Sequence, residues 1–156
     1  MTQEVDLSEM RGALQQLVGR AAWGVRLGEG SFVTIEFGSE TGVPLRGGRQ
    51  HGEFHLWIYC TAWRLETKDG MIAGSEDARA DMEAAIARLN GLALTAVDAE
   101  WPSLSLSLVF TDGLVLRTFS VFSKDCEHWH LYSPGGRVYT AGPGSQASLE
   151  LASSKL

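Results

Sequence analysis

The sequence predicts an α+β fold with a strongly curved, mainly antiparallel sheet. This sheet is expected to be barrel-like and partly closed, with one helix packed on it and a further helix at the N-terminus. Two segments carry apolar residues at helical spacing, most of the remaining chain alternates with the period of a strand, and short turns join successive strands. Strands joined by tight turns pair antiparallel, whereas parallel pairing needs long crossovers.

The two helices are predicted from their apolar stripes and their end signals. Residues 7–18 carry apolar side chains at helical spacing, and Asp6 or Ser8 is expected to act as the N-cap. Residues 76–90 form the clearer helix, with Ser75 as the expected N-cap and acidic residues in the first turn. Each helix has one apolar face, which we expect to pack on the sheet.

Short strands occupy most of the chain after the second helix. In the segment SLSLSLVF, residues 103–110, leucines alternate with serines, which indicates one buried and one solvent-exposed face. Asp112 and Gly113 are expected to form a type I′ hairpin turn, and the segment SPGG at 133–136 a second hairpin.

Residues 53–66 are predicted to form one long central strand that is apolar on both sides. One side carries His55, Trp57, Tyr59 and Trp63, and the other carries Phe54, Leu56, Ile58, Cys60 and Ala62. A strand of this kind is covered above and below. We expect the helix 76–90 against one side, and the curled sheet, a pocket or a second subunit against the other.

A glycine-rich segment at residues 38–52 precedes this strand and is predicted to be a long loop. It carries Arg46, Arg49 and His51, a local basic cluster in an acidic chain. The two arginines and the backbone amides between them are suited to bind an anion. Solvated arginines on a flexible loop are the alternative interpretation.

Length and charge limit the classes of protein. The chain has 156 residues and a net charge of -6, which predicts a single α+β domain over 1–142 and a poorly ordered tail over 143–156. The acidic balance argues against nucleic acid as a partner, because phosphate binding needs clustered Lys and Arg. It leaves a basic protein as a partner. No signal peptide or membrane span is expected, so the predicted location is cytoplasmic.

Two cysteines, Cys60 and Cys126, are too few for a disulfide framework. Cys60 lies in the most apolar stretch of the chain, so we expect a buried free thiol there.

The candidate site residues come from three groups of side chains. The row of His55, Trp57 and Tyr59 is either a ligand groove, since flat rings with polar tips stack on sugars and other planar molecules, or core packing. His128 and His130 leave one face of a strand and suit two metal ligands, or are simply two polar positions of a half-exposed strand.

Arg46 and Arg49 complete this set of candidate ligand-binding residues. Nothing in the sequence supplies the third and fourth ligands of a metal, so no metal and no cofactor are predicted. No coherent catalytic set is present either, so no catalytic residue is predicted.

Several segments together resemble small bacterial domains of unknown function, some of which are immunity proteins that block secreted toxins by direct binding. These segments are GSFVTIEFG, HGEFHLWIYCTAWRLE, SEDARADMEAAIARLNG and GLVLRTFSVFSKDCEHWHLYSPGG, within roughly residues 20–142. The resemblance supplies no established activity and assigns no catalytic or binding residue. The absence of a catalytic set, the acidic balance and the abundant aromatic residues favour a non-enzymatic role.

Two functions are therefore expected from the sequence. The first is a non-enzymatic protein-interaction module, immunity-like, that binds another protein or self-associates, for instance as a dimer. The alternative is a small-ligand or metal-binding protein, with its site on the aromatic and histidine side of strand 53–66. Neither nucleic acid nor a membrane is expected as a partner.

Overall fold

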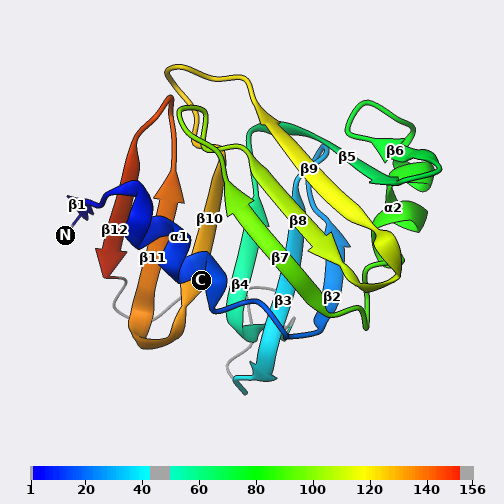
Figure 1. The fold of residues 1–156 in the computed structure, drawn as a ribbon, viewed down its shortest axis with the longest axis horizontal. Helices are drawn as coiled ribbons and strands as arrows, with labels where there is room; N and C mark the ends of the chain where they lie inside the picture. The colour runs from blue at the N-terminus through cyan, green and yellow to red at the C-terminus, as the bar shows by residue number, and fades with distance from the viewer. Residues whose placement is uncertain (1, 43–49, 152–156) are drawn as a thin grey trace.

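A computed structural model describes residues 2–42 and 50–151, which form two antiparallel sheets and two helices (Figure 1). The seven-stranded sheet has the order β1-β12-β11-β10-β4-β3-β2, and the five-stranded sheet has the order β6-β5-β9-β8-β7. In chain order the elements are β1 (Thr2–Glu4), α1 (Leu7–Gln15), β2 (Ala22–Leu27), β3 (Val33–Glu40), β4 (Gly52–Ile58), β5 (Thr61–Thr67), β6 (Gly70–Gly74), α2 (Arg79–Ala87), β7 (Leu94–Ala99), β8 (Leu106–Phe110), β9 (Val115–Ser120), β10 (Trp129–Ser133), β11 (Arg137–Ala141) and β12 (Ala147–Leu151).

The α+β class and the antiparallel pairing are confirmed, but the barrel-like curvature is not supported. Among the described residues, neither sheet closes on itself or curls strongly. Figure 1 shows instead that α1, β7, β8 and β9 lie in front of the seven-stranded sheet. The apolar residues are buried between these two layers, so two open sheets replace the single bent one.

The long strand predicted at 53–66 is two strands, β4 and β5, which belong to different sheets. The break lies at Cys60, where the Thr61 amide donates to the Tyr59 carbonyl at 3.0 Å in a turn of γ type. The turn changes which side chains face the core. Leu56 and Ile58 are buried before it, and Trp63 is buried after it.

A further connection joins the two sheets at the opposite side of the sandwich. Ala21 and Ala93 form an antiparallel bridge between the segments that lead into β2 and β7. Backbone hydrogen bonds on both sides of the bridge, such as Gly19 N to Leu94 O at 2.8 Å, extend this contact. The chain passes from one sheet to the other at the β4–β5 and β9–β10 junctions, and this bridge adds a further main-chain contact between the layers.

Helix α1 covers the part of the seven-stranded sheet that the smaller sheet leaves open (Figure 1). Its buried residues are Met10, Ala13 and Leu14. The polar side of α1 reaches the outer edge of β7, where Arg11 Nε donates to Ala99 O at 3.1 Å and Gln15 Nε2 donates to Val97 O at 3.0 Å. Helix α1 therefore contributes to the core and also satisfies carbonyls of an edge strand.

The predicted N-cap residue is confirmed for the first helix and wrong for the second. Asp6 caps α1 and accepts from the Glu9 amide at 2.8 Å. Helix α2 begins later than predicted, and its N-cap is Ala78, whose side chain makes no capping bond. The hydroxyl of Ser75 accepts instead from the Trp63 amide at 3.0 Å, which fixes the end of β6 against β5.

The hairpin predictions and the alternation are largely confirmed. Asp112 and Gly113 have φ values of 65° and 75°, as a type I′ turn requires. The alternating leucines of β8 are buried, but Ser105 is buried as well, because its hydroxyl bonds to Ser103 and to Ser120. The expected solvent-exposed face is therefore partly used to hold the chain together.

The C-terminal segment forms a strand, whereas the sequence predicted a poorly ordered tail from residue 143. Ala147–Leu151 is β12, which pairs with β11 on one side and with β1 on the other. Leu149 is buried in the core. Residues 152–156 lie outside the described part of the chain.

The prediction of a free thiol at Cys60 was wrong. Cys60 and Cys126 form a disulfide across 66 positions of sequence, with their Cα atoms 6.1 Å apart. The pairing was missed because only the fold brings the β4–β5 junction beside the segment before β10. Disulfides are typical of oxidising compartments, and the cytoplasmic location stays a prediction. Within the described residues, no helix is long and apolar enough to cross a membrane.

Candidate functional site

Seven ring side chains form a continuous row on the outer side of the seven-stranded sheet, opposite the core. We call this row the aromatic face. It consists of His51, His55, Tyr132, His130, Trp57, Tyr59 and Phe32. Neighbouring ring centroids along it are 4.7 to 6.4 Å apart. All of these side chains except His55 are half-buried, so most of the rings keep part of their surface accessible.

The pairing of β10 with β4 brings these rings together. His130 lies opposite Trp57, and Tyr132 lies opposite His55. Residues opposite each other on one side of an antiparallel pair are in contact range. The backbone therefore places rings that are about 75 positions apart in sequence into one row.

The rings of Trp57 and Tyr59 form the centre of the row. Their planes meet at 64° and their centroids are 4.7 Å apart. His130 lies 5.4 Å from Trp57, and Phe32 lies 4.7 Å from Tyr59. Tilted and edge-to-face contacts of this kind are favourable for aromatic pairs. The four rings thus form a connected set of aromatic contacts.

A buried carboxylate–imidazole pair lies at one end of the row. Glu36 Oε2 is 2.7 Å from His55 Nδ1, with the side chains 3% and 8% exposed respectively. The second oxygen of Glu36 accepts from the Gly52 amide at 2.9 Å. Both oxygens of the carboxylate are thus used, and they fix the orientation of the imidazole. The ring of Tyr132 meets that of His55 at 70°.

The environment of His130 disfavours the charged form of its imidazole. Burial lowers its pKa, and the charges of Glu127 and Glu150 raise it only in part. Its Nδ1 lies 2.9 Å from the hydroxyl of Thr140 on β11. Burial and the charge of Glu150 raise the pKa of Tyr132, which keeps its hydroxyl protonated. The centre of the row therefore offers neutral polar groups beside its rings.

His51 has hydrogen-bond partners for both ring nitrogens. Its Nδ1 is 2.9 Å from Gly52 O, and its Nε2 is 3.3 Å from Thr41 Oγ1. The imidazole thus closes the end of the row next to His55, with a partner for each of its nitrogens.

The predicted partnership of His128 with His130 is not observed, because the two imidazoles have different surroundings. His128 precedes β10 and is fully buried, with Nε2 2.8 Å from Gly144 O. Gly142 lies so close that a Cβ there would touch the imidazole. Among the residues that the structure describes, no group of three or more His, Cys, Asp or Glu side chains is arranged to hold a metal ion.

The remaining predicted residues divide between the core and the part of the chain that is not described. Trp63, expected beside Trp57, is buried between the sheets, where its indole nitrogen donates to Ser31 O at 2.7 Å. Arg46 and Arg49 lie outside the described residues, so their role as ligand-binding residues stays a prediction. Of the predicted set, His55, Trp57, Tyr59 and His130 are together.

Three residues of this site were missed from the sequence: Phe32 and Tyr132 of the aromatic face, and Glu36, which pairs with His55. Tyr132 follows from the period of two that placed His130, and Glu36 interrupts an apolar strand at an outward position. Phe32 precedes β3, so no period marks it. The pairing of Glu36 with His55 depends on the register of β3 with β4, which the sequence did not supply.

Comparisons of the chain with protein-family models, with curated proteins and with solved structures find no match. The resemblance to immunity-type domains therefore stays a prediction.

Proposed function

We propose that this protein binds a neutral carbohydrate, non-enzymatically, on the aromatic face. The observation that carries the proposal is the position of the rings. Trp57, Tyr59 and His130 lie on the outer side of a sheet whose inner side already supplies the core. Rings that pack no core and keep accessible surface are suited to cover the apolar face of a sugar.

The polar groups around the rings match a ligand rich in hydroxyls. Thr34 lies opposite Trp57 on β3, Thr140 lies opposite His130 on β11, and Ser148 lies opposite Thr140 on β12. These hydroxyls border the row on both sides and both donate and accept hydrogen bonds. Polar groups of this kind fix the orientation of a ligand that stacking alone would leave free to rotate.

The charges near the face favour a neutral ligand over an anionic one. The carboxylates of Glu127 and Glu150 act on His130, and Glu150 also acts on Tyr132. An anion placed on these rings would meet like charges. The net charge of -6 has the same effect at longer range.

The test is affinity electrophoresis of the full chain in gels that contain a neutral polysaccharide: a β-glucan, a xylan, a mannan or an α-glucan. At least one should retard the wild type, and calorimetry with its oligosaccharide should then give a dissociation constant. Trp57→Ala should weaken binding by about tenfold or more, because stacking on a ring contributes on the order of 1–2 kcal/mol. Trp57→Phe should restore part of it.

Trp101→Ala is the matched control, because Trp101 is exposed and lies outside the aromatic face. It should bind like the wild type. The absence of retardation by every polysaccharide, or equal loss in both variants, would refute the proposal. Unfolding curves of all variants separate loss of binding from loss of fold.

Protein interaction is a second candidate function, which the large exposed apolar side chains favour. Trp101, Phe119, Val121 and Phe122 are all exposed. Large exposed apolar side chains that gather on neighbouring segments are typical of interaction sites.

A further inference from the structure

Four of the large exposed apolar side chains lie on two neighbouring segments, the stretch before β8 and the end of β9 with the residues that follow it. Trp101 is 61% exposed, Phe119 68%, Val121 57% and Phe122 41%. Their segments are joined by hydrogen bonds. The Ser120 amide donates to Ser105 Oγ at 3.0 Å, and the Gly144 amide donates to Phe122 O at 2.9 Å. We call these four residues the apolar end.

A pocket of about 590 Å³ opens beside Trp101. Its walls come from the start of α1, the turn 101–104 and the loop 143–147. Val5, Leu7 and Leu104 provide an apolar floor, and Glu4 and Asp6 provide the charged groups of the lining. The volume is ample for one or two amino-acid side chains.

The turn that carries Trp101 is held in place without help from the indole. Ser145 Oγ donates to Pro102 O at 2.6 Å, and Trp129 Nε1 donates to Leu104 O at 2.8 Å. Ser103 Oγ bonds to Ser105 Oγ at 3.0 Å. The turn is thus anchored to two other segments while Trp101 projects into solvent. The backbone of the turn is therefore fixed before a partner binds, and only the side chain of Trp101 has to be ordered on binding.

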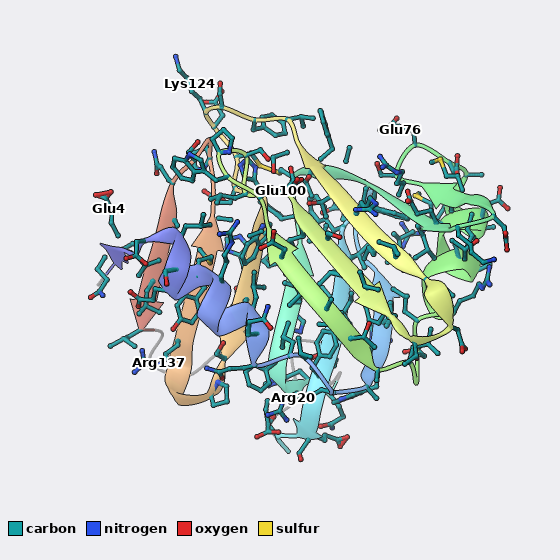
Figure 2. The ribbon with its side chains drawn as sticks, in the orientation of Figure 1. Glu4, Arg20, Glu76, Glu100, Lys124 and Arg137 are labelled. Carbon is teal, nitrogen blue, oxygen red and sulfur yellow. A yellow bond between two sulfur atoms is a disulfide. The ribbon has the colours of Figure 1, made fainter. Side chains whose placement is uncertain are left out.

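The charges around the pocket are mainly negative. Glu4 and Asp6 line it, and Glu100 precedes Trp101; none of the three forms an ion pair with a cation of the described residues. The nearest basic residue in sequence is Lys124, next to the lining residue Ser123. Figure 2 shows Lys124 at the top of the view and Glu4 at its left margin, both pointing away from the body of the molecule.

We propose that the apolar end and this pocket form a second binding surface, for a segment of a partner protein. The partner places an apolar side chain in the pocket against Trp101, and a Lys or Arg beside Glu4 and Asp6. The apolar floor provides affinity by burial, and the two carboxylates select the charge. The indole of Trp101 can also stack on the cation.

Charge favours a basic partner segment over two other possible occupants of this surface, a second copy of the chain and an anionic lipid surface. A second copy of the chain would bring the same carboxylates to the interface, and like charges that face each other are costly. The segments that carry the exposed rings hold Glu100 and Asp125 and a single lysine, Lys124, whereas membrane-binding surfaces are rich in Lys and Arg. Neither clash arises with a basic segment.

The test uses the full ¹⁵N-labelled chain and three short probes: N-acetyl-Leu-Arg-amide, N-acetyl-Leu-Glu-amide and N-acetyl-Gly-Arg-amide. The Leu-Arg probe should give saturable shifts of the Trp101 indole and of the Gly144 and Gln146 amides. The Leu-Glu and Gly-Arg probes should each bind about fivefold more weakly or not at all, because each lacks one of the two contacts. Saturable binding of Leu-Glu at equal strength would overturn the proposal.

Variants locate the binding. Trp101→Ala and Glu4→Gln should each weaken the Leu-Arg probe by about fivefold, and Trp57→Ala should leave it unchanged. The side chains of Trp101 and Glu4 are exposed, so we expect both variants to fold, and unfolding curves check this. Sedimentation of the pure chain tests the competing occupant. A dimer that Trp101→Ala dissociates, or no saturable shift with the Leu-Arg probe, would refute a basic partner segment.

Discussion

Removal of the Cys60–Cys126 disulfide should destabilise the protein by about 4 kcal/mol. The bridge closes a loop of 66 positions. In the chain-entropy account, a cross-link of that span removes roughly 15 cal/mol/K from the unfolded chain, or about 4 kcal/mol at 25 °C. For a chain of this length, each kcal/mol corresponds to a shift of about 2–4 °C in Tm. The double variant Cys60→Ala/Cys126→Ala should therefore unfold about 8–16 °C below the wild type.

Urea unfolding followed by tryptophan fluorescence measures the difference. Wild type in reductant is the matched control, because it lacks the bridge but keeps both side chains, and it should have nearly the stability of the double variant. A thiol assay on the unfolded, unreduced wild type should find no free thiol. Two free thiols, or a stability difference below about 1 kcal/mol, would refute the reasoning.

Three further predictions concern stability and pH. Gly52→Ala should destabilise by more than about 2 kcal/mol in urea unfolding, because its Cβ would overlap the carbonyl oxygen of Phe37. Gly12→Ala, exposed inside α1 with nothing near its Cβ, should instead stabilise by about 0.5–1 kcal/mol; a loss of stability would contradict the helix assignment. The imidazole of His130, followed by NMR, should titrate below the usual pKa of 6.5. Because the unfolded chain then binds the proton more readily than the folded chain, His130 should lower the free energy of unfolding as the pH falls through 6.5. The variant His130→Asn should lack this pH-dependent loss of stability. A pKa of His130 above 6.5 would contradict the burial argument.

Local signals in the sequence predicted the local structure well. The helical stripe and Asp6 located α1, and the alternation of leucines located β8. Asp112 and Gly113 marked a hairpin turn, because few other residue pairs take positive φ twice in succession. Each of these features depends on neighbours within a few positions, so no knowledge of the fold was needed.

Features that depend on contacts between distant segments were missed. The apolar run at 53–66 has the same period on both sides of Cys60, and nothing in it marks the turn at which the chain leaves one sheet for the other. The disulfide with Cys126 and the partnership of Glu36 with His55 have the same origin. Trp57 and Trp63 were placed on one side for this reason, although only Trp57 lies on the aromatic face.

The side chains of Arg11 and Gln15 cover the outer edge of β7 by hydrogen bonds to its carbonyl groups. A strand at the margin of a sheet offers bare carbonyls that another chain can recruit, and such recruitment starts aggregation. Here the carbonyls of Val97 and Ala99 are already taken by α1. Helix α1 thus protects the edge of β7 against aggregation and also buries apolar core residues. A chain that lacks its first 16 residues would lose both effects.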